Sequence, residues 1–465
     1  MLARDGRVQF EQFQDMIARL YPEHSSLGKS KMESTLSRSV TFQVTDACNL
    51  ACTYCYQHNK GTRKMSIDVA KRFVDLLLSG EKGMSEYVSP DKSPAIIFDF
   101  IGGEPFLEVE LIDEICDYIF HRMIELDHPW LDKHIFSLCS NGVLYNDPKV
   151  QKFLNKHKND LSFSITIDGN KELHDSCRVF PDGRPSYDIA VAAAQDWMSK
   201  GHYMGSKITI APGNLQYLES AINHMIDLGY VEINANCVYE KGWEIEHAQE
   251  FYVRLKRIAD SFINRGLTQR IYLSLFSPTF FRPKPGYDLQ NWCGGTGMML
   301  SCDPDGYLYP CIRYMESSLG DCQVPYRIGD VWNGIGQEKI YCDRIKCMNC
   351  INRRTESTDE CFYCPVADGC AYCSAYNYEV YGTPDSRATF ICDMHKARAL
   401  ANYYYYSRQG MHQDVWLPKE DALRIISEDE WESLINHPNI EVMTKEHLEQ
   451  FHKEHASKES ESKLR

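Results

Sequence analysis

Residues 40–55 read VTFQVTDACNLACTYC, a β-like run followed at once by three cysteines in the spacing C-x3-C-x2-C. Cys48, Cys52 and Cys55 suit one face of a cubane iron–sulfur cluster, whose irons are held by cysteine thiolates. A closed [4Fe–4S] site takes four ligands, and no fourth cysteine stands close by in the sequence. One iron would be open to a small molecule that chelates through an amine and a carboxylate. Zinc in a knuckle prefers four ligands, commonly in paired C-x2-C hooks, so the spacing favours iron.

From residue 40 to about residue 264 the chain alternates strand-like and helix-like segments. The predicted strands are 40–44, 96–101, 134–139, 161–167, 207–211 and 231–237. The predicted helices are 67–78, 109–126, 148–157, 187–200, 218–228 and 247–264. Six βα units predict a parallel sheet with right-handed crossovers. They are too few for an eight-fold barrel, so the expected fold is α/β, a partial (β/α)6 TIM-like barrel with a C-terminal cysteine-rich domain.

Residues suited to a binding site follow the predicted strands, at the end where parallel barrels place their chemistry. Gly102-Gly103-Glu104-Pro105 follows the second strand; its glycines let the backbone approach a ligand, and Glu104 could pair with an ammonium group. Alone, this run also fits an ordinary strand-to-helix turn. Ser140-Asn141-Gly142 closes the third strand. The fourth carries Ser164 and continues through Asp168-Gly169 to His174-Asp175-Ser176-Cys177-Arg178.

After Gly266 the alternation stops and cysteines accumulate. Cys293 is followed by twelve residues, Gly306, four residues and Cys311. Downstream stand Cys361-x2-Cys364-x5-Cys370-x2-Cys373 and then Cys392. Structural zinc held by the 347/350 and 361/364 hooks is an alternative to iron–sulfur clusters here. The surplus cysteines are Cys302, Cys322, Cys342, Cys347 and Cys350.

Composition restricts the class of protein. A length of 465 residues suggests about two to four domains. The net charge of −15 argues against a nucleic-acid partner. No apolar run approaches the roughly 20 residues that cross a bilayer, and the first residues carry no hydrophobic signal core, so no membrane partner is expected. Nineteen cysteines in clusters then indicate metal ligation in a reducing cytoplasm rather than disulfides.

The cysteine loop, with Tyr54 before its last cysteine and a GGEP run after the second strand, resembles the radical S-adenosylmethionine (SAM) superfamily. The run from Asp168 to Arg178 resembles that of peptide and sulfatase maturases. The resemblance implies that the cluster on Cys48, Cys52 and Cys55 binds SAM. The residues that it implies for SAM binding are Tyr54, Gly102, Gly103, Glu104, Pro105, Asn141, Ser164 and Arg178.

The C-terminal cysteines resemble the seven-cysteine SPASM extension, in which two auxiliary [4Fe–4S] clusters are bound. The resemblance implies an inner cluster on Cys293, Cys311 and Cys373, either completed by a surplus cysteine or left open at one iron. It implies an outer cluster on Cys361, Cys364, Cys370 and Cys392. The chain departs from the pattern once, with two residues between Cys370 and Cys373 where three are usual.

This combination resembles radical SAM/SPASM maturases of ribosomally made peptides (RiPPs). Within them it is most similar to thioether-forming ranthipeptide maturases of the cysteine-repeat group, such as the freyrasin maturase. The resemblance implies a 5′-deoxyadenosyl radical that takes hydrogen from a peptide carbon, and a bond from cysteine sulfur to that carbon. The implied partners are a cysteine-containing precursor peptide and a flavodoxin- or ferredoxin-type electron donor. No catalytic side chain is assigned beyond the clusters.

Other functions remain open. Anaerobic sulfatase (formylglycine) maturases also resemble the chain, but they place an aspartate base directly after the cysteine equivalent to Cys311, where Ile312 stands here. A multi-cluster electron-transfer protein explains the cysteines but neither the GGEP run nor six βα units. A zinc-organised binding module fits less well still.

The expected domains are a helical extension at 1–39, a radical SAM core at 40–265, a connector at 266–290, a SPASM domain at 291–410 and a tail at 411–465. The tail is expected to be disordered from residue 456, because it is nearly without apolar residues there. A leader-binding winged-helix domain is not expected before the core, since folded domains usually need roughly 50 residues or more.

Overall fold

The computed structural model describes residues 37–291, 293–320 and 323–462, with the backbone alone for 455–462. The helical extension predicted at 1–39 lies outside these residues, except for its last three positions, which belong to the first strand. The described chain therefore begins at the strand that leads into the cysteine loop.

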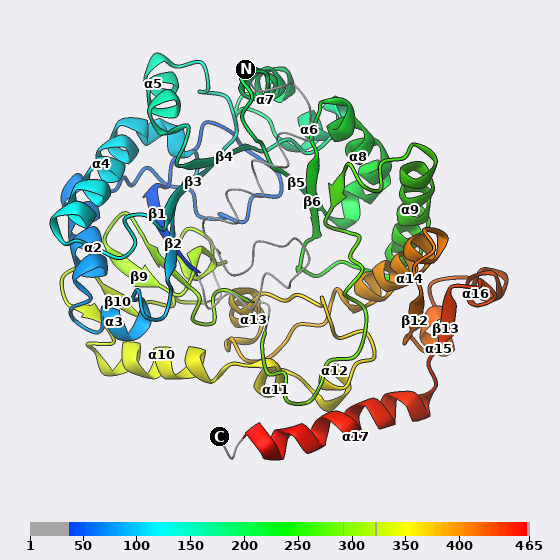
Figure 1. The fold of residues 1–465 in the computed structure, drawn as a ribbon. Helices are drawn as coiled ribbons and strands as arrows, with labels where there is room; N and C mark the ends of the chain where they lie inside the picture. Colours follow the sequence, from blue (N-terminus) through cyan, green and yellow to red (C-terminus); the bar gives the residue numbers. More distant parts are fainter. Residues whose placement is uncertain (1–36, 292, 321–322, 463–465) are drawn as a thin grey trace.

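Six parallel strands curve around an interior, and all six occur where the sequence predicts them (Figure 1). The first four form one parallel ladder in chain order, and the next two form a second ladder that continues the curve. Their bounds are β1 (Ser37–Thr45), β2 (Ala95–Gly102), β3 (His134–Ser140), β4 (Leu161–Ile165), β5 (Ser206–Ile210) and β6 (Glu232–Cys237).

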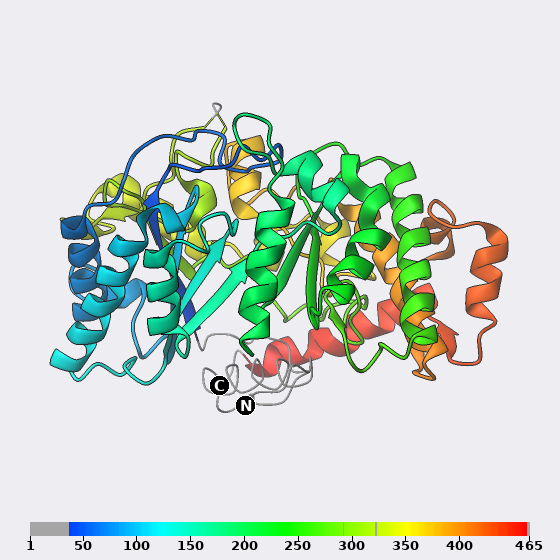
Figure 2. The same cartoon turned by 90° about the horizontal axis from the view of Figure 1, so that it is seen from above.

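Helices cover the outer face of the strands, as the view from above shows (Figure 2). The long ones are α2 (Ile67–Ser79), α4 (Val109–Glu125), α5 (Pro148–His157), α7 (Tyr187–Ser199), α8 (Leu218–Asp227) and α9 (Ile245–Asn264). Shorter turns are α3 (Met84–Tyr87), η2 (Pro105–Glu108), α6 (Lys171–Cys177) and η3 (Pro212–Tyr217). Local chemistry fixes where they begin: at α5 the Asp147 carboxylate accepts the Lys149 amide (2.8 Å) and Pro148 takes the first helical position.

Strand register gives the barrel two chemically different faces. Phe42 of β1 packs against Phe73 of α2, with ring centroids 4.8 Å apart, so its neighbour Thr41 points to the interior. Thr41 is in register with Asp99 of β2, and Asp99 is in register with Ser137 of β3. Burial raises the pKa of Asp99 to about 6, while hydrogen bonds from Ser137 and Thr41 oppose that rise. The outer face is therefore apolar and the interior carries a polar row.

The cysteine-rich region is joined to the barrel through the sheet. Its strand β8 (Met299–Cys302) pairs in parallel with β1, and β9 (Tyr307–Tyr309), β10 (Gly329–Asp330) and β11 (Gly334–Ile335) continue antiparallel from it. The resulting sheet has the order β11-β10-β9-β8-β1-β2-β3-β4, while the two-residue β7 (Tyr272–Leu273) extends the other ladder beyond β6. These strands were not predicted, because each is at most four residues long and stands outside the strand–helix alternation.

The region beyond β9 is mainly helical. Its elements are η4 (Ile312–Tyr314), α10 (Lys339–Cys350), α11 (Arg353–Glu356), α12 (Asp359–Phe362), α13 (Ser374–Tyr381) and α14 (Cys392–Arg408). The tyrosine-rich α14 packs on α9, where the Tyr404 hydroxyl donates to Asp260 (2.6 Å). Tyr403 and Tyr405 are buried, so α14 is a packed helix rather than the edge of an open groove.

The first part of the tail forms a small addition beside α9 and α14, and its last helix runs back below α11 and α12 (Figure 1). It contains β12 (Gln413–Val415), α15 (Lys419–Ala422), α16 (Glu428–Ile435), β13 (Ile440–Val442) and α17 (Lys445–Ser462). Disorder was expected from residue 456, but α17 continues to Ser462. Among the described helices, none combines the length and the apolar composition needed to cross a bilayer.

Candidate functional site

Main-chain hydrogen bonds hold the cysteine loop on two sides, at the C-terminal end of the strands. The Glu104 amide, just after β2, donates to the Ala47 carbonyl (2.9 Å). On the other side the bonds run from Ala51 N to Val179 O (2.8 Å) and from Thr53 N to Cys177 O (2.9 Å). The loop is thus fixed between the segments that follow β2 and α6.

The two glycines of the GGEP run are required by this close packing. A Cβ on Gly103 would lie 2.4 Å from the Ala47 carbonyl oxygen and 2.7 Å from the Cβ of Cys48. A Cβ on Gly102 would lie 2.9 Å from the Thr45 carbonyl oxygen. Real Cβ atoms do not approach backbone so closely, so any larger residue at 103 would displace the loop that carries the first cysteine.

Glu104 is buried and joins three segments. Its carboxylate accepts from the Phe106 amide (3.1 Å), the Ser140 hydroxyl (2.8 Å) and the Asn141 amide (2.9 Å). Burial raises the pKa of Glu104 by more than these hydrogen bonds lower it, so the pKa is raised overall. A carboxylate has about four lone-pair positions, so one remains for a further donor such as an ammonium group.

Arg178 links the cysteine loop to the end of β4. Its Nε donates to Asp168 (2.8 Å), and its Nη1 lies 3.8 Å from the sulfur of Cys52. Its guanidinium also lies over the Tyr54 ring, 5.3 Å from the centroid, and the Tyr54 hydroxyl donates to Asp168. Burial tends to lower the pKa of Arg178, but Asp168, Tyr54 and Cys52 outweigh it and the pKa is raised. The predicted residues Tyr54 and Arg178 are thus brought together around a charged, buried pair.

The remaining residues predicted for SAM binding lie close by or in the same wall. The Asn141 amide side chain donates to Asn49 inside the cysteine loop (2.7 Å). Pro105 is buried at the start of η2, and Ser164 lies in β4 opposite Cys139 of β3. The sequence pattern assigned no role to Asp168, which stands ten positions before Arg178. The sequence signal that could have identified Asp168 is a carboxylate at a strand end followed by an arginine.

The three cysteines predicted for the inner cluster converge. A Cβ on Gly295 would lie 3.3 Å from the sulfur of Cys311 and 3.5 Å from that of Cys293. Burial and, after it, the nearby Cys293 raise the pKa of Cys373 to about 11. The Ser374 hydroxyl, 3.1 Å from the Cys293 sulfur, lies in the same place. These thiols hold their protons when free, and a metal would have to displace them.

Arg313 connects this inner set to the cysteine loop. Its guanidinium lies over the ring of Tyr56, which follows the loop, 5.5 Å from the centroid. It pairs with Glu240 (3.0 Å) and Glu379 (3.7 Å). The pKa of Arg313 is raised despite burial, first through the influence of Cys373. The inner cysteines therefore lie on the side of the barrel where the cysteine loop is.

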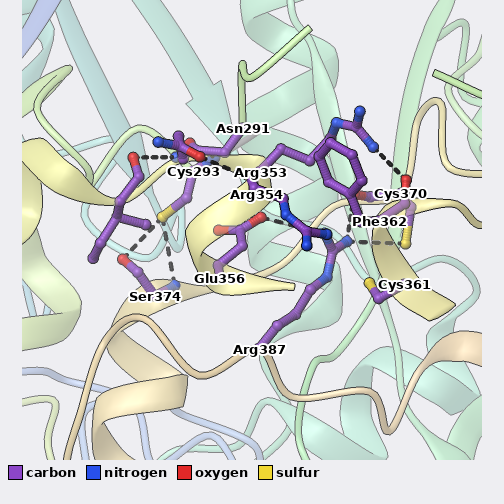
Figure 3. A network of polar contacts seen from close by, with 12 residues as sticks. Asn291, Cys293, Arg353, Arg354, Glu356, Cys361, Phe362, Cys370, Ser374 and Arg387 are labelled. Carbon is purple, nitrogen blue, oxygen red and sulfur yellow. Dashed lines mark hydrogen bonds and ion pairs between the residues drawn. The ribbon is translucent and has the colours of Figure 1, made fainter. Parts of the chain in front are cut away.

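The four cysteines predicted for the outer cluster line one cavity of about 910 Å³. Cys361 comes from α12, Cys364 and Cys370 from the loop after it, and Cys392 from the start of α14. Arg353 braces this loop by donating to the carbonyls of Phe362 (2.6 Å), Asp288 (2.8 Å) and Pro285 (2.8 Å). Figure 3 shows that Arg387 reaches from the other side to Cys370.

The surplus cysteines lie in different environments. Cys302 is fully buried in β8 and donates to the Asp303 carbonyl (3.5 Å). Cys342, Cys347 and Cys350 lie on α10, and Cys347 neighbours Tyr326 and Cys350. Cys322 lies outside the described residues. All described cysteines are free of disulfides.

The donor set fits iron–sulfur clusters. The sequence implied three thiols on the cysteine loop, three at the inner site and four at the outer site. The structure places Cys293 and Cys311 beside Gly295 with Cys373 near both, and it places the four outer cysteines around one cavity. Two of the sulfurs, of Cys52 and Cys370, already have an arginine donor beside them, and thiolates of a cluster accept such hydrogen bonds.

The chain was compared with known proteins. No family model matches it. It is 27% identical over 204 residues to an uncharacterized protein of Methanocaldococcus jannaschii, a match that covers 44% of this chain and 64% of that protein, slightly less than two thirds of its length. It is 24% identical over 307 residues to the cysteine-type anaerobic sulfatase-maturating enzyme of Clostridium perfringens, covering 60% of this chain and 76% of the enzyme.

Two solved structures share the fold. One is native anSMEcpe with bound AdoMet and a peptide, at a TM-score of 0.55 and 17% identity, covering 80% of this chain and 98% of the other. The second is Streptococcus suis SuiB bound to the precursor peptide SuiA, at a TM-score of 0.53 and 12% identity, covering 82% and 80%. The partial barrel with a cysteine-rich extension is therefore confirmed, and with it the resemblance in fold to SAM-binding and peptide-binding proteins.

Proposed function

We propose that this chain is a radical SAM peptide maturase that joins a cysteine sulfur to a carbon of a ribosomally made precursor peptide. The observation that carries the proposal is the inner set of converging thiols beside Ile312. The carboxylates next to this set, Glu240 and Glu379, are paired with Arg313 and so are poor candidates for a free base.

The first cluster and SAM would be held at the cysteine loop. Cys48, Cys52 and Cys55 would ligate the irons, Glu104 has one lone-pair position left for the SAM amino group, and Arg178 stands beside the loop to meet a carboxylate. When bound and reduced, the cluster supplies an electron for SAM cleavage, which yields a radical that takes hydrogen from carbon. The polypeptide supplies position: the loop is fixed from both sides, so the radical forms at a defined place in the polar interior.

The peptide sulfur would be held at the inner cysteines. A metal held by Cys293, Cys311 and Cys373 would lower the pKa of a bound thiol, so the peptide sulfur would bind without its proton and no side-chain base would be needed. This agrees with Ile312, a half-buried apolar residue, at the position directly after Cys311. The bond that forms is sulfur to carbon; two hydrogens leave, one to the SAM-derived radical and one as a proton. A cluster held by the inner cysteines would take up the remaining electron. A flavodoxin- or ferredoxin-type protein is the expected electron donor for SAM cleavage.

The test is an anaerobic assay with a cysteine-containing precursor peptide, SAM and a reductant. Each crosslink should lower the peptide mass by about 2 Da, and the product should resist reduction and thiol alkylation. A product that regains free thiols on reduction is a disulfide and contradicts the proposal. Equal modification of a peptide with serine in place of cysteine contradicts it as well.

Formylglycine formation on a sulfatase is the second candidate, and the comparisons favour it equally. The relative from Clostridium perfringens is named as a sulfatase-maturating enzyme, and anSMEcpe shares the fold. Formylglycine is an aldehyde and reacts with a hydrazide, whereas a thioether does not. Incubating the chain with both a sulfatase-derived peptide and a cysteine-repeat peptide, followed by hydrazide capture, separates the two reactions.

A further inference from the structure

The outer cysteine cavity contains a buried ion pair that is not needed to ligate metal. Arg387 and Glu356 pair through Nη1 and Oε1 (3.3 Å), and their side chains are 10% and 0% exposed. Figure 3 shows the pair between Cys293 of the inner set and Cys361 and Cys370 of the outer set. A charged pair so far from water needs a further interaction to offset its desolvation.

Arg387 makes that further interaction with Cys370, a predicted cluster ligand. Its Nη2 donates to the Cys370 sulfur (3.1 Å) and to the Cys370 carbonyl (2.8 Å). The guanidinium therefore faces the sulfur directly, without an intervening side chain. Its planar fork lets one nitrogen pair with Glu356 while the other contacts sulfur, an arrangement that lysine does not reproduce.

The charge of Arg387 is secure in this setting. A guanidinium is not deprotonated in proteins, and Arg387 is paired with the Glu356 carboxyl. A fixed positive charge and a hydrogen bond to sulfur both stabilise the more negative, reduced form of an iron–sulfur cluster, and the potential of such clusters depends on these two factors.

We propose that Arg387, oriented by Glu356, sets the reduction potential of the iron–sulfur cluster at the outer site, raising it so that this cluster accepts electrons from the inner one. The inference rests on the outer cluster of the proposed function, but not on the identity of the peptide product. Arg387 is a positioning residue here: it acts through the ligand Cys370.

A short covalent path connects the outer set of cysteines to the inner set. Cys370, assigned to the outer cluster, and Cys373, assigned to the inner one, are separated by only two residues. The second of these, Tyr372, is buried, and the Arg387 guanidinium lies over its ring, 5.0 Å from the centroid. The same arginine therefore contacts both an outer ligand and the residue that links the two sets.

The experiment is a redox titration of the fully loaded enzyme, followed by electron paramagnetic resonance at each poised potential. The signal of the outer cluster is identified as the part that disappears when Cys361 and Cys364 are both replaced by alanine. The variants are Arg387→Gln, which removes the positive charge, and Glu356→Gln, which removes the opposing carboxylate while keeping Arg387. Burial raises the pKa of Glu356 to about 7, so the titration is run at a pH well above that value, where the carboxyl is ionised. The matched control is Arg354→Gln, a partly exposed arginine in the same region that pairs with Asp359 on the surface.

Arg387→Gln should lower the reduced-to-oxidised ratio of the outer cluster about tenfold or more at a fixed potential, which is 59 mV for one electron. Glu356→Gln should raise that ratio, and Arg354→Gln should leave it unchanged. If Arg387→Gln loses the outer cluster's iron, Glu356→Gln alone decides. An unchanged ratio in the variants that keep their iron, or a wild-type enzyme with no outer cluster, overturns the inference. Failure to form a thioether overturns only the proposed reaction, because the titration contains no peptide.

Discussion

The cysteine loop and the outer cysteine cavity each contain a buried pair of an arginine and a carboxylate, but the backbone around the two pairs is built differently. In each, an arginine pairs with a buried carboxylate and donates to one cysteine sulfur: Arg178 with Asp168 to Cys52, and Arg387 with Glu356 to Cys370. At the loop, main-chain hydrogen bonds with the segment after β2 and with the end of α6 fix the cysteines. At the cavity, the cysteines come from a helix end, a loop and another helix, and arginine side chains hold them together.

Because of this difference, we expect the two cysteine sites to respond differently to substitution. The loop depends on glycines and strand ends, so a change in backbone should remove its cluster altogether. The cavity depends on side-chain charge, so a change there should alter the electronic properties of a cluster that is still bound. The following predictions test this contrast, from the largest expected effect to the smallest.

Replacing Cys48, Cys52 and Cys55 together with alanine should abolish SAM cleavage, because no iron is then left to chelate SAM. Replacing Cys361 and Cys364 together should leave some uncoupled cleavage while the peptide product is lost. Chromatography of 5′-deoxyadenosine and mass spectrometry of the peptide measure the two activities. Equal loss of both in a folded Cys361/Cys364 variant argues against separate roles for the two regions.

Gly103→Ala should remove about four of roughly twelve irons, one cubane's worth, and leave the auxiliary clusters in place. The added Cβ would lie 2.4 Å from the Ala47 carbonyl oxygen and must displace the cysteine loop. Gly213→Ala is the matched control, because no atom lies within 4 Å of its added Cβ. Iron analysis after anaerobic reconstitution measures both. Full iron content in Gly103→Ala would show that the loop tolerates a shift.

These two regions also differ in how far the sequence predicted them. The alternation of strand-like and helix-like segments placed all six barrel strands. In β1, for example, Val40, Phe42 and Val44 stand at every second residue and are buried. The loop and the GGEP run lie next to those strands, so their contact followed from topology. Nothing in periodicity predicted the pairing of Glu356 with Arg387, which are 31 residues apart in a region of short helices and loops. The strand β8 was missed for the same reason: its pairing with β1 is long-range and only four residues long.

Arg178→Met should destabilise the protein by about 3 kcal/mol, because it leaves the Asp168 carboxylate buried and unpaired. Asp168→Asn should also destabilise it, and the double variant should lose less than the sum of the two. Lys149→Met is the control: its pair with Glu110 is 61% and 72% exposed, so its loss should be far smaller than that of Arg178→Met. Anaerobic thermal unfolding of the loaded protein compares them. Additive losses in the double variant would mean that the two side chains act independently.

His174 should make stability depend on pH. It is buried beside the Asp168–Arg178 pair; its Nε2 hydrogen-bonds with the Ser186 hydroxyl (3.1 Å). Burial, and next Arg178, lower its pKa to about 4. In the unfolded chain a histidine has a pKa of about 6.5, so between these values the unfolded state binds a proton that the folded state does not. Stability is therefore fully present above pH 6.5 and is lost as the pH falls towards about 4.

Between pH 7.5 and 5.5 this linkage amounts to about 1 kcal/mol. His174→Gln should remove that part of the pH dependence, since glutamine does not titrate, whatever it does to stability at pH 7.5. His412→Gln, at an exposed position on the tail, should keep the wild-type dependence. Anaerobic urea unfolding of the wild type and the two variants at both pH values, with iron content checked at each, gives the three differences required. A His174→Gln variant that loses as much stability on acidification as the wild type would assign the pH dependence to other groups, such as the cluster thiolates.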